Sequence, residues 1–415
     1  MSALFEWKIR KIRTPINLRF LIGIFWIGLL LGGCDSPPAA TPAEAPVRVV
    51  QETTRALSVA VPAAQTDKKW VGDFAVYIQN AQEEGGIPGI SLAVVNRDGP
   101  VLVQGYGLRD VAKGLPVDGD TLFHIGSTHK SMTALLVATL VDEGALGWDT
   151  PVIEIDPDFA LADDEATATV TFRHLLSMTS GIPDDAEDDL PDDTTVEDVF
   201  AVAAEAGLLG APGEVFSYSN ISASLAGYLA ARAAGSDADD LHAGYARLLQ
   251  KRLLDPLGMK KSTVYVTEAR QNSNHSLAYD TSGGAPEALE SEDQDDDALA
   301  PSGSLKAGAR EMGLYMQMLV NRGVTPDGTR IVSEKSLAEM WTPLLESYGL
   351  GWEMAKVDGQ RLVSHTGAFD GFVSVIGLLP EEGVGFVLLV NDEEGGGDLT
   401  DAAAQEFAKI YSESK

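Results

Sequence analysis

The sequence holds almost no cysteine and few basic side chains. Cys34 is the single cysteine among 415 residues, which excludes an intramolecular disulfide. The chain has 30 lysines and arginines against 62 aspartates and glutamates, so its formal net charge is −32. This acidity argues against nucleic acid or an anionic membrane surface as a partner, because both carry negative charge themselves. An acidic surface that keeps the protein soluble is the simplest interpretation.

The sequence also lacks the patterns of two common classes of hydrolase. Its histidines form no His-x-His or His-Glu-x-x-His cluster, so we predict no metal site and no cofactor. It contains no Gly-x-Ser-x-Gly elbow, which argues against an α/β-hydrolase. His124 and His129 are interpreted as structural residues rather than metal ligands.

The amino-terminal region has the pattern of a secretory signal. Basic residues from Lys8 to Arg19 precede an apolar run, Phe20–Leu31, which is followed by Gly32 and Gly33. At about 1.5 Å per residue this run spans roughly 18 Å, too short for a stable membrane crossing. The junction LGGC resembles a bacterial lipobox, which implies a signal peptide over 1–33 and lipidation of Cys34. The alternative is an uncleaved amino-terminal anchor. In both cases the protein is extracytoplasmic and held to a membrane, at the periplasmic face or the cell surface.

Beyond Cys34 the chain divides by composition. Residues 34–66 are rich in proline and alanine and predict an extended tether. Residues 67–415 predict an α/β (α+β) domain: a central antiparallel sheet flanked by helices, with an inserted, mostly helical lobe. The strand patterns place the α/β lobe at about 67–149 and 301–415, and the helical lobe at about 150–300. The acidic run at 184–193 is interpreted as a solvated loop.

A lysine at an unusual place draws attention to residues 123–148. The run from Met132 to Val141 is almost entirely apolar, which predicts a helix that is buried on most of its circumference. Ser127 and Lys130 lie three residues apart at its beginning, so their side chains share one face. The amino-terminal end is the unfavourable end of a helix for a cation. The lysine therefore has an energetic cost that calls for an explanation.

Nucleophilic catalysis explains this arrangement. A serine hydroxyl needs a nearby base to take its proton, and a lysine can be that base only as the neutral amine. Burial and the positive potential of a helix amino terminus both favour the neutral form. The same helix end offers backbone N–H groups to an oxyanion. The competing interpretation is structural, with a capping serine and a lysine that reaches solvent.

Two further segments carry side chains suited to the same chemistry. Tyr218-Ser219-Asn220 precedes a predicted helix, and His365-Thr366-Gly367 lies on a predicted strand where the glycine permits close backbone approach. Taken singly, each has a structural interpretation as a turn tyrosine, a surface asparagine or a strand-edge histidine.

Together and in this order, the three segments resemble the serine β-lactamase and penicillin-binding-protein superfamily. The branch with class C β-lactamases, D-aminopeptidases, D,D-carboxypeptidases and related esterases is most similar, over about residues 70–412. Further segments typical of that branch are RHLLSMTSGIP, LLDPLGMKKS, PSGSL and YGLGW. The resemblance implies that Ser127 is the acylated nucleophile, Lys130 its base and Tyr218 a proton relay. It also implies that Asn220 binds the acyl side of the substrate, that His365, Thr366 and Gly367 line the opposite wall, and that Ser127 and Ala368 N–H groups form the oxyanion hole.

One departure from the pattern bears on the substrate. The β-lactamases of this superfamily carry lysine where this chain has His365, and a histidine near pH 7 is mostly neutral. We therefore expect a serine hydrolase that cleaves small-molecule carboxylic esters or D-amino-acid-type amides. A β-lactamase or D,D-carboxypeptidase is the first alternative, and a non-catalytic lipoprotein that binds wall peptides is the second. The sequence does not determine the oligomeric state.

Overall fold

The computed structural model describes residues 68–191, 193–237, 240–289 and 297–415. The expected signal peptide, Cys34 and the tether up to residue 66 lie outside the described residues. The chain divides into two compact units, and all described residues belong to the second, Glu52–Lys415. Among the described residues, no helix has the length and apolar character needed to cross a membrane.

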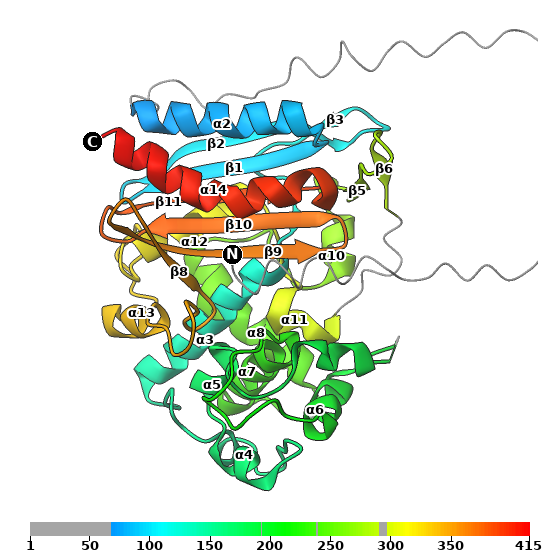
Figure 1. The fold of residues 1–415 in the computed structure, drawn as a ribbon, viewed down its shortest axis with the longest axis vertical. Coiled ribbons are helices and arrows are strands. Elements are labelled where there is room, and N and C mark those ends of the chain that lie inside the picture. Colours follow the sequence, from blue (N-terminus) through cyan, green and yellow to red (C-terminus); the bar gives the residue numbers. More distant parts are fainter. Residues whose placement is uncertain (1–67, 192, 238–239, 290–296) are drawn as a thin grey trace, which may run out of the picture. The chain divides into compact units, whose positions relative to one another are not determined.

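A seven-stranded antiparallel sheet forms the centre of this unit (Figure 1). Its spatial order is β3-β2-β1-β11-β10-β9-β8, so strands from the two ends of the globular region pair at β1 and β11. This confirms the expected antiparallel sheet. The strands are β1 (Gly89–Asn96), β2 (Gly99–Asp110), β3 (Leu115–Pro116), β8 (Glu353–Val357), β9 (Gln360–Phe369), β10 (Phe372–Leu379) and β11 (Val384–Val390).

Helices cover both faces of the sheet. On one face α2 (Lys69–Gly85) and α14 (Glu393–Glu413) pack side by side, and on the other face lies α12 (Ala309–Val320) (Figure 1). Side chains of β1 therefore enter two separate hydrophobic clusters, Leu92 and Val94 on the α2/α14 side and Ala93 and Val95 on the other. Burial on both faces explains why these strands are continuous apolar runs rather than alternating ones.

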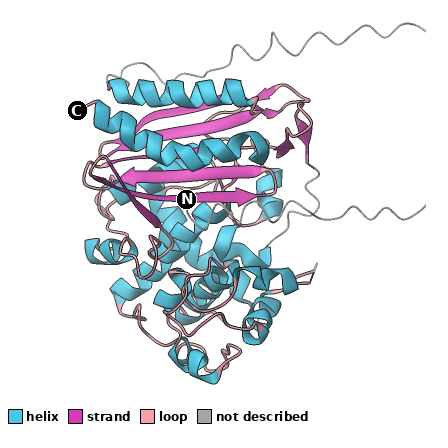
Figure 2. Cartoon of the chain, in the orientation of Figure 1, coloured by secondary structure: helices cyan, strands magenta, loops and turns pink. Residues whose placement is uncertain are grey.

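The middle of the chain is mostly helical, as Figure 2 shows. Its helices are α4 (Asp164–Thr169), α5 (Phe172–Leu176), α6 (Val196–Glu205), α7 (Asn220–Ala233), α8 (Leu241–Leu249), α9 (Asp255–Leu257), α10 (Val266–Gln271) and α11 (Ala300–Gly303), with a π-helical turn, η6 (Gln250–Leu254). Helix α13 (Glu334–Met340) follows later in the chain.

A small hairpin lies within the segment that was predicted to be mostly helical. Strands β5 (Tyr279–Asp280) and β6 (Glu287–Ala288) form this hairpin, which is held to the α/β part, and the lobe boundary at about residue 300 stays a prediction. The Tyr279 amide donates a hydrogen bond to the Asn391 carbonyl at 2.9 Å, next to α14. Two-residue strands leave too short a pattern in the sequence to be recognised.

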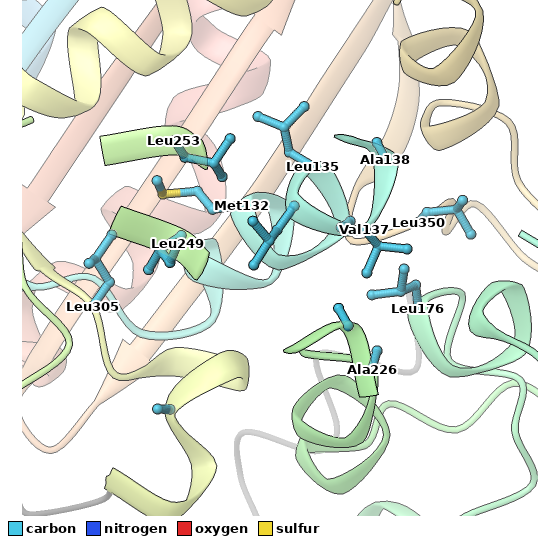
Figure 3. Close-up of a cluster of buried hydrophobic side chains, with 14 of the residues drawn as sticks. Met132, Leu135, Val137, Ala138, Leu176, Ala226, Leu249, Leu253, Leu305 and Leu350 are labelled. Carbon is cyan, nitrogen blue, oxygen red and sulfur yellow. The ribbon is translucent and has the colours of Figure 1, made fainter. Parts of the chain in front are cut away.

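Helix α3 (His129–Glu143) is buried among segments from both parts of the domain. Every residue from His129 to Leu140 is buried, which confirms the prediction of a helix enclosed on most of its circumference. Figure 3 shows its apolar side chains among those of surrounding elements, which include Ala226 of α7, Leu249, Leu305 and Leu350. The first turn of α3 therefore begins in a dry environment.

Candidate active site

Ser127 lies on a tight turn between the sheet and α3. It belongs to a short 3₁₀ helix, η2 (Gly126–Thr128), and is partly exposed whereas both of its chain neighbours are buried. Gly126 has φ +51°, and a Cβ there would come within 2.7 Å of the Ala368 nitrogen, so the turn requires glycine. The Ile125 carbonyl accepts hydrogen bonds from Ser374 Oγ at 2.7 Å and from Thr128 Oγ1 at 2.8 Å. These bonds fix the serine against the sheet.

Lys130 lies in the first turn of α3 and is 1% exposed. Its Nζ donates to Ser127 Oγ at 2.9 Å, to Asn220 Oδ1 at 2.6 Å and to the Ser302 carbonyl at 3.0 Å. The two acceptors other than the serine hold the nitrogen in place beside the hydroxyl. The three donated bonds use all three hydrogens of an ammonium, so the nitrogen can accept the Ser127 proton only after it loses one of them and keeps its bonds to Asn220 and Ser302.

The Tyr218 side chain lies beside the same pair of groups. Its phenol forms a hydrogen bond with Ser127, and its ring centroid is 4.8 Å from Lys130 Nζ. Burial raises the pKa of Tyr218 above its ordinary value of 10, the bond with Ser127 opposes this, and the charges of Glu353 and Glu187 raise the pKa further. The phenol is therefore protonated near neutral pH and able to donate its proton.

Asn220 opens helix α7 and connects the lysine to a carboxylate. Ser219 caps the helix by accepting a hydrogen bond from the Ser222 amide, so the Asn220 side chain emerges from the first helical position. Its Oδ1 accepts from Lys130, and its Nδ2 donates to Glu187 Oε2 at 2.6 Å. Both ends of the amide are thereby assigned, which defines the orientation of the side chain.

Glu187 corrects the interpretation of the acidic run at 184–193. The first part of that run is a 3₁₀ helix, η4 (Asp184–Asp189), and Glu187 is half-buried against Asn220 instead of extending into solvent. The surrounding aspartates Asp185, Asp188 and Asp189 are exposed. A single inward-facing carboxylate within a run of six acidic or small residues gives no distinguishing signal in the sequence.

The opposite wall of the site is the end of strand β9. Strand β8 pairs with β9 only from Gln360 to Ser364, so the following residues extend past it along η2. A Cβ on Gly367 would lie 2.4 Å from the Ile125 carbonyl oxygen and 2.9 Å from the Ser127 nitrogen. The two backbones therefore touch at a place where no side chain fits. Ala368 packs its methyl group against the α2/α14 cluster, which leaves its backbone on the side of the serine.

His365 is a neutral residue in this wall. Its Nε2 lies 2.8 Å from the Tyr348 hydroxyl, and its Nδ1 lies 2.5 Å from the Thr366 carbonyl oxygen. A carbonyl can only accept, so Nδ1 carries the proton and Nε2 accepts from the phenol. Burial, followed by the charge of Lys130, lowers the pKa of His365 to about 3. Thr366 itself is half-buried on the strand.

The structure brings the side chains of Ser127, Lys130, Tyr218 and Asn220 into one hydrogen-bonded group, with His365 and Gly367 across from it. Sequence reasoning missed three participants: the Ser302 carbonyl, Glu187 and Tyr348. The first and last belong to PSGSL and YGLGW, which were noted as segments but were given no role. His124 and His129 are engaged elsewhere. The His124 ring stacks on Phe369 at 3.6 Å, and His129 Nε2 lies 3.1 Å from the Tyr245 hydroxyl.

No cluster of three or more histidine, cysteine, aspartate or glutamate side chains suited to hold a metal ion occurs in the part of the chain that the structure describes.

Comparison with known proteins identifies the family of this chain and proteins that share its fold. A family model described as Beta-lactamase matches residues 74–409. Penicillin-binding protein 4 of Amycolatopsis lactamdurans is 32% identical over 342 residues, which cover 80% of this chain and 86% of that protein. The octameric penicillin-binding protein homologue from Pyrococcus abyssi superposes with a TM-score of 0.70 at 26% identity, over 82% of this chain and 77% of that one. A class C beta lactamase from Rhodobacter sphaeroides shares the fold, with a TM-score of 0.65 at 22% identity over 82% and 99%.

Proposed function

The chain belongs to the beta-lactamase family of serine hydrolases, and from this premise we propose that Ser127 forms a covalent acyl-enzyme with a carboxylic ester or a D-amino-acid-type amide. The observation that carries the proposal is the contact between Lys130 Nζ and Ser127 Oγ at 2.9 Å, beneath a Tyr218 phenol that bonds to the same hydroxyl. Two groups able to exchange protons thus flank one partly exposed serine.

Acylation would proceed through these groups. Lys130, as the neutral amine, takes the proton of Ser127 while Oγ attacks the substrate carbonyl carbon. The N–H groups of Ser127 and Ala368 receive the resulting oxyanion. The tetrahedral intermediate then collapses, the bond to the leaving alcohol or amine breaks, and Tyr218 gives the leaving group its proton. Tyr218 regains a proton from Lys130, which returns both groups to their starting states.

Deacylation uses the same groups with water as the nucleophile. Tyr218 takes the proton of the attacking water as it passes its own proton to the neutral Lys130 amine, and the oxyanion forms in the same place. Lys130 then returns that proton to Ser127 Oγ as the acyl bond breaks. The products are a carboxylic acid and the free enzyme. No step in this scheme requires a metal ion or an organic cofactor.

The substrate proposal depends on His365. A neutral imidazole whose Nε2 already accepts from Tyr348 provides no cation for a substrate carboxylate. Esters and amides without that carboxylate are therefore favoured over penicillins or D,D-peptides. The alternative, a β-lactamase or D,D-carboxypeptidase, is supported by the name of the Amycolatopsis relative.

Intact-mass detection of covalent adducts tests the proposal. The protein is offered a fluorophosphonate, a penicillin and a short D-alanyl peptide in parallel. We expect a fluorophosphonate adduct on Ser127 that disappears in Ser127→Ala and remains in Ser131→Ala, since the buried Ser131 hydroxyl donates to the Thr128 carbonyl of η2. An adduct that persists in Ser127→Ala would overturn the assignment of the nucleophile. A long-lived penicillin adduct would favour the alternative.

We also propose an extracytoplasmic location with a lipid anchor at Cys34. The LGGC junction supports it, and residues 1–67 lie outside the described part of the chain. Full-length protein expressed in a bacterium with labelled palmitate should carry label and remain with membranes, whereas Cys34→Ser should lose the label. Equal labelling of both would contradict the proposal.

A further inference from the structure

The charges around Ser127 differ from one side of the site to the other. On the acyl side, hydrogen bonds connect the nucleophile through Lys130 and Asn220 to the carboxylate of Glu187. On the strand side, His365 is neutral and capped by Tyr348. A substrate placed between the two walls would meet a negative charge beside its acyl group and no cation from His365.

We propose that Glu187 is a specificity-determining residue, which binds a substrate ammonium group next to the acyl carbonyl. The inference rests on the proposed function and narrows its substrate class to esters or amides whose acyl part carries a free amine. Glu187 touches Asn220 Nδ2, the donor expected to face the acyl side of the substrate. An ammonium near that donor would come within reach of the Glu187 carboxylate.

The position of Glu187 suits this role. It is half-buried, so its charge is less screened than that of the exposed aspartates on the same 3₁₀ helix. Its influence reaches the reacting groups, because its charge acts on the Tyr218 phenol. Glu353, at the beginning of β8, acts on Tyr218 and Tyr348 in the same direction. Both carboxylates favour a cationic substrate and oppose an anionic one.

A purely structural role for Glu187 makes a different prediction. If the carboxylate only orients the Asn220 amide, its replacement should affect all substrates equally. Glu187→Gln separates the two roles, because glutamine keeps an oxygen that can accept from Asn220 Nδ2 but carries no charge. Binding of an ammonium then weakens while the orientation of Asn220 is retained.

The test compares three acyl groups of nearly equal shape, each prepared as a p-nitroanilide and as a methyl ester. D-alanine carries an ammonium, isobutyric acid is neutral with a methyl group in the same place, and methylmalonic acid, as its mono-derivative, is anionic with a carboxylate there. For the wild type we expect kcat/KM to fall in that order, with at least a tenfold ratio between the first two. In Glu187→Gln this ratio should approach one through loss on the ammonium substrate alone. Asp189→Asn, on an exposed neighbour in η4, should leave the ratio unchanged.

Three results would overturn the inference: no preference for the ammonium substrate in the wild type, no cleavage of any D-alanine compound, or an equal loss on all three substrates in Glu187→Gln. Failure of the proposed function is separate. It would appear as p-nitrophenyl acetate hydrolysis that is undiminished in Ser127→Ala. The wild-type ratio alone decides the matter if Glu187→Gln does not fold.

Discussion

The two walls that face Ser127 differ in their chemistry and in the elements that build them. The wall from the helical side presents Lys130, Tyr218 and Asn220, all held near the first turns of helices α3 and α7. The wall from the sheet presents the backbone of Gly367 and Ala368 and the neutral ring of His365. One wall holds groups that can exchange protons or carry charge, and the other holds closely packed backbone.

We infer from this difference that the two walls have separate roles in the reaction. Helix ends place side chains in a dry environment with a defined electrostatic potential, which suits proton transfer. A strand edge places backbone amides with little freedom to move, which suits the binding of an oxyanion. Substitutions on the helical wall should therefore reduce the chemical step, whereas substitutions on the strand wall should alter positioning and selectivity.

Loss of the lysine amine should have the largest effect. Lys130→Met keeps a side chain of similar length in the buried first turn of α3 but removes the amine that we propose as the base, so we expect kcat/KM for p-nitrophenyl acetate to fall by about 10³-fold. Lys306→Met is a matched control, because Lys306 is also buried (5% exposed) and its Nζ donates to the Val264 carbonyl at 3.0 Å. The control should retain most activity in protein that remains folded by circular dichroism. A loss of less than tenfold in Lys130→Met would mean that another group acts as the base.

A methyl group on the strand wall should have the next largest effect. In Gly367→Ala the new Cβ would approach the Ile125 carbonyl oxygen at 2.4 Å, so η2 and β9 must separate. We expect kcat/KM to fall by about 10²-fold, because the Ser127 and Ala368 amides, which we propose as the oxyanion hole, would move apart. Gly397→Ala in α14 is the control, since a Cβ there meets nothing within 4 Å. Unchanged kinetics in Gly367→Ala would show that the backbone approach is not required.

The sequence predicts those parts of the two walls that a strong local pattern encodes. The apolar run after Ser127 predicted the buried helix, and the spacing of Ser127 and Lys130 predicted their shared face. Other elements have a concealed boundary: helix α14 begins at Glu393, because Asp392 caps it by accepting a hydrogen bond from the Gly395 amide. The three glycines in its first turns concealed that beginning, since glycine is a poor helix former.

Other features depend on contacts between distant segments. The Tyr348 hydroxyl meets His365 across a turn of the edge strands, and Glu187 meets Asn220 from a separate 3₁₀ helix. Neither pair has a local spacing that a pattern could detect. The high charge density of the acidic run predicts that its side chains are exposed to solvent. Packing between distant segments nevertheless places one of them, Glu187, against Asn220.

A cation on the strand wall should change selectivity by a smaller factor. His365→Lys introduces the charge that the resemblance to β-lactamases would place here, so we expect acylation by benzylpenicillin to rise about tenfold. This corresponds to about 1.4 kcal/mol. His365→Gln, which stays neutral and can still bond to Tyr348, should show no such gain. Intact-mass time courses measure both rates, and equal rates in the two variants would show that this wall does not select for carboxylates.

The last prediction concerns stability rather than catalysis, and it depends on the neutral state of His365 in the strand wall. The pKa of His365 is lowered to about 3 from 6.5, so between these values the unfolded chain binds more protons than the folded one. The stabilisation from the neutral ring is therefore complete above pH 6.5 and is lost as the pH falls toward 3, by about 1.4 kcal/mol per pH unit. Denaturant unfolding at pH 7, 6 and 5 should show a shallower acid loss in His365→Gln than in the wild type, because glutamine does not titrate. Tyr348→Phe keeps the histidine and should retain the steep loss. Parallel curves for the wild type and His365→Gln would show that the ring is not held neutral by burial.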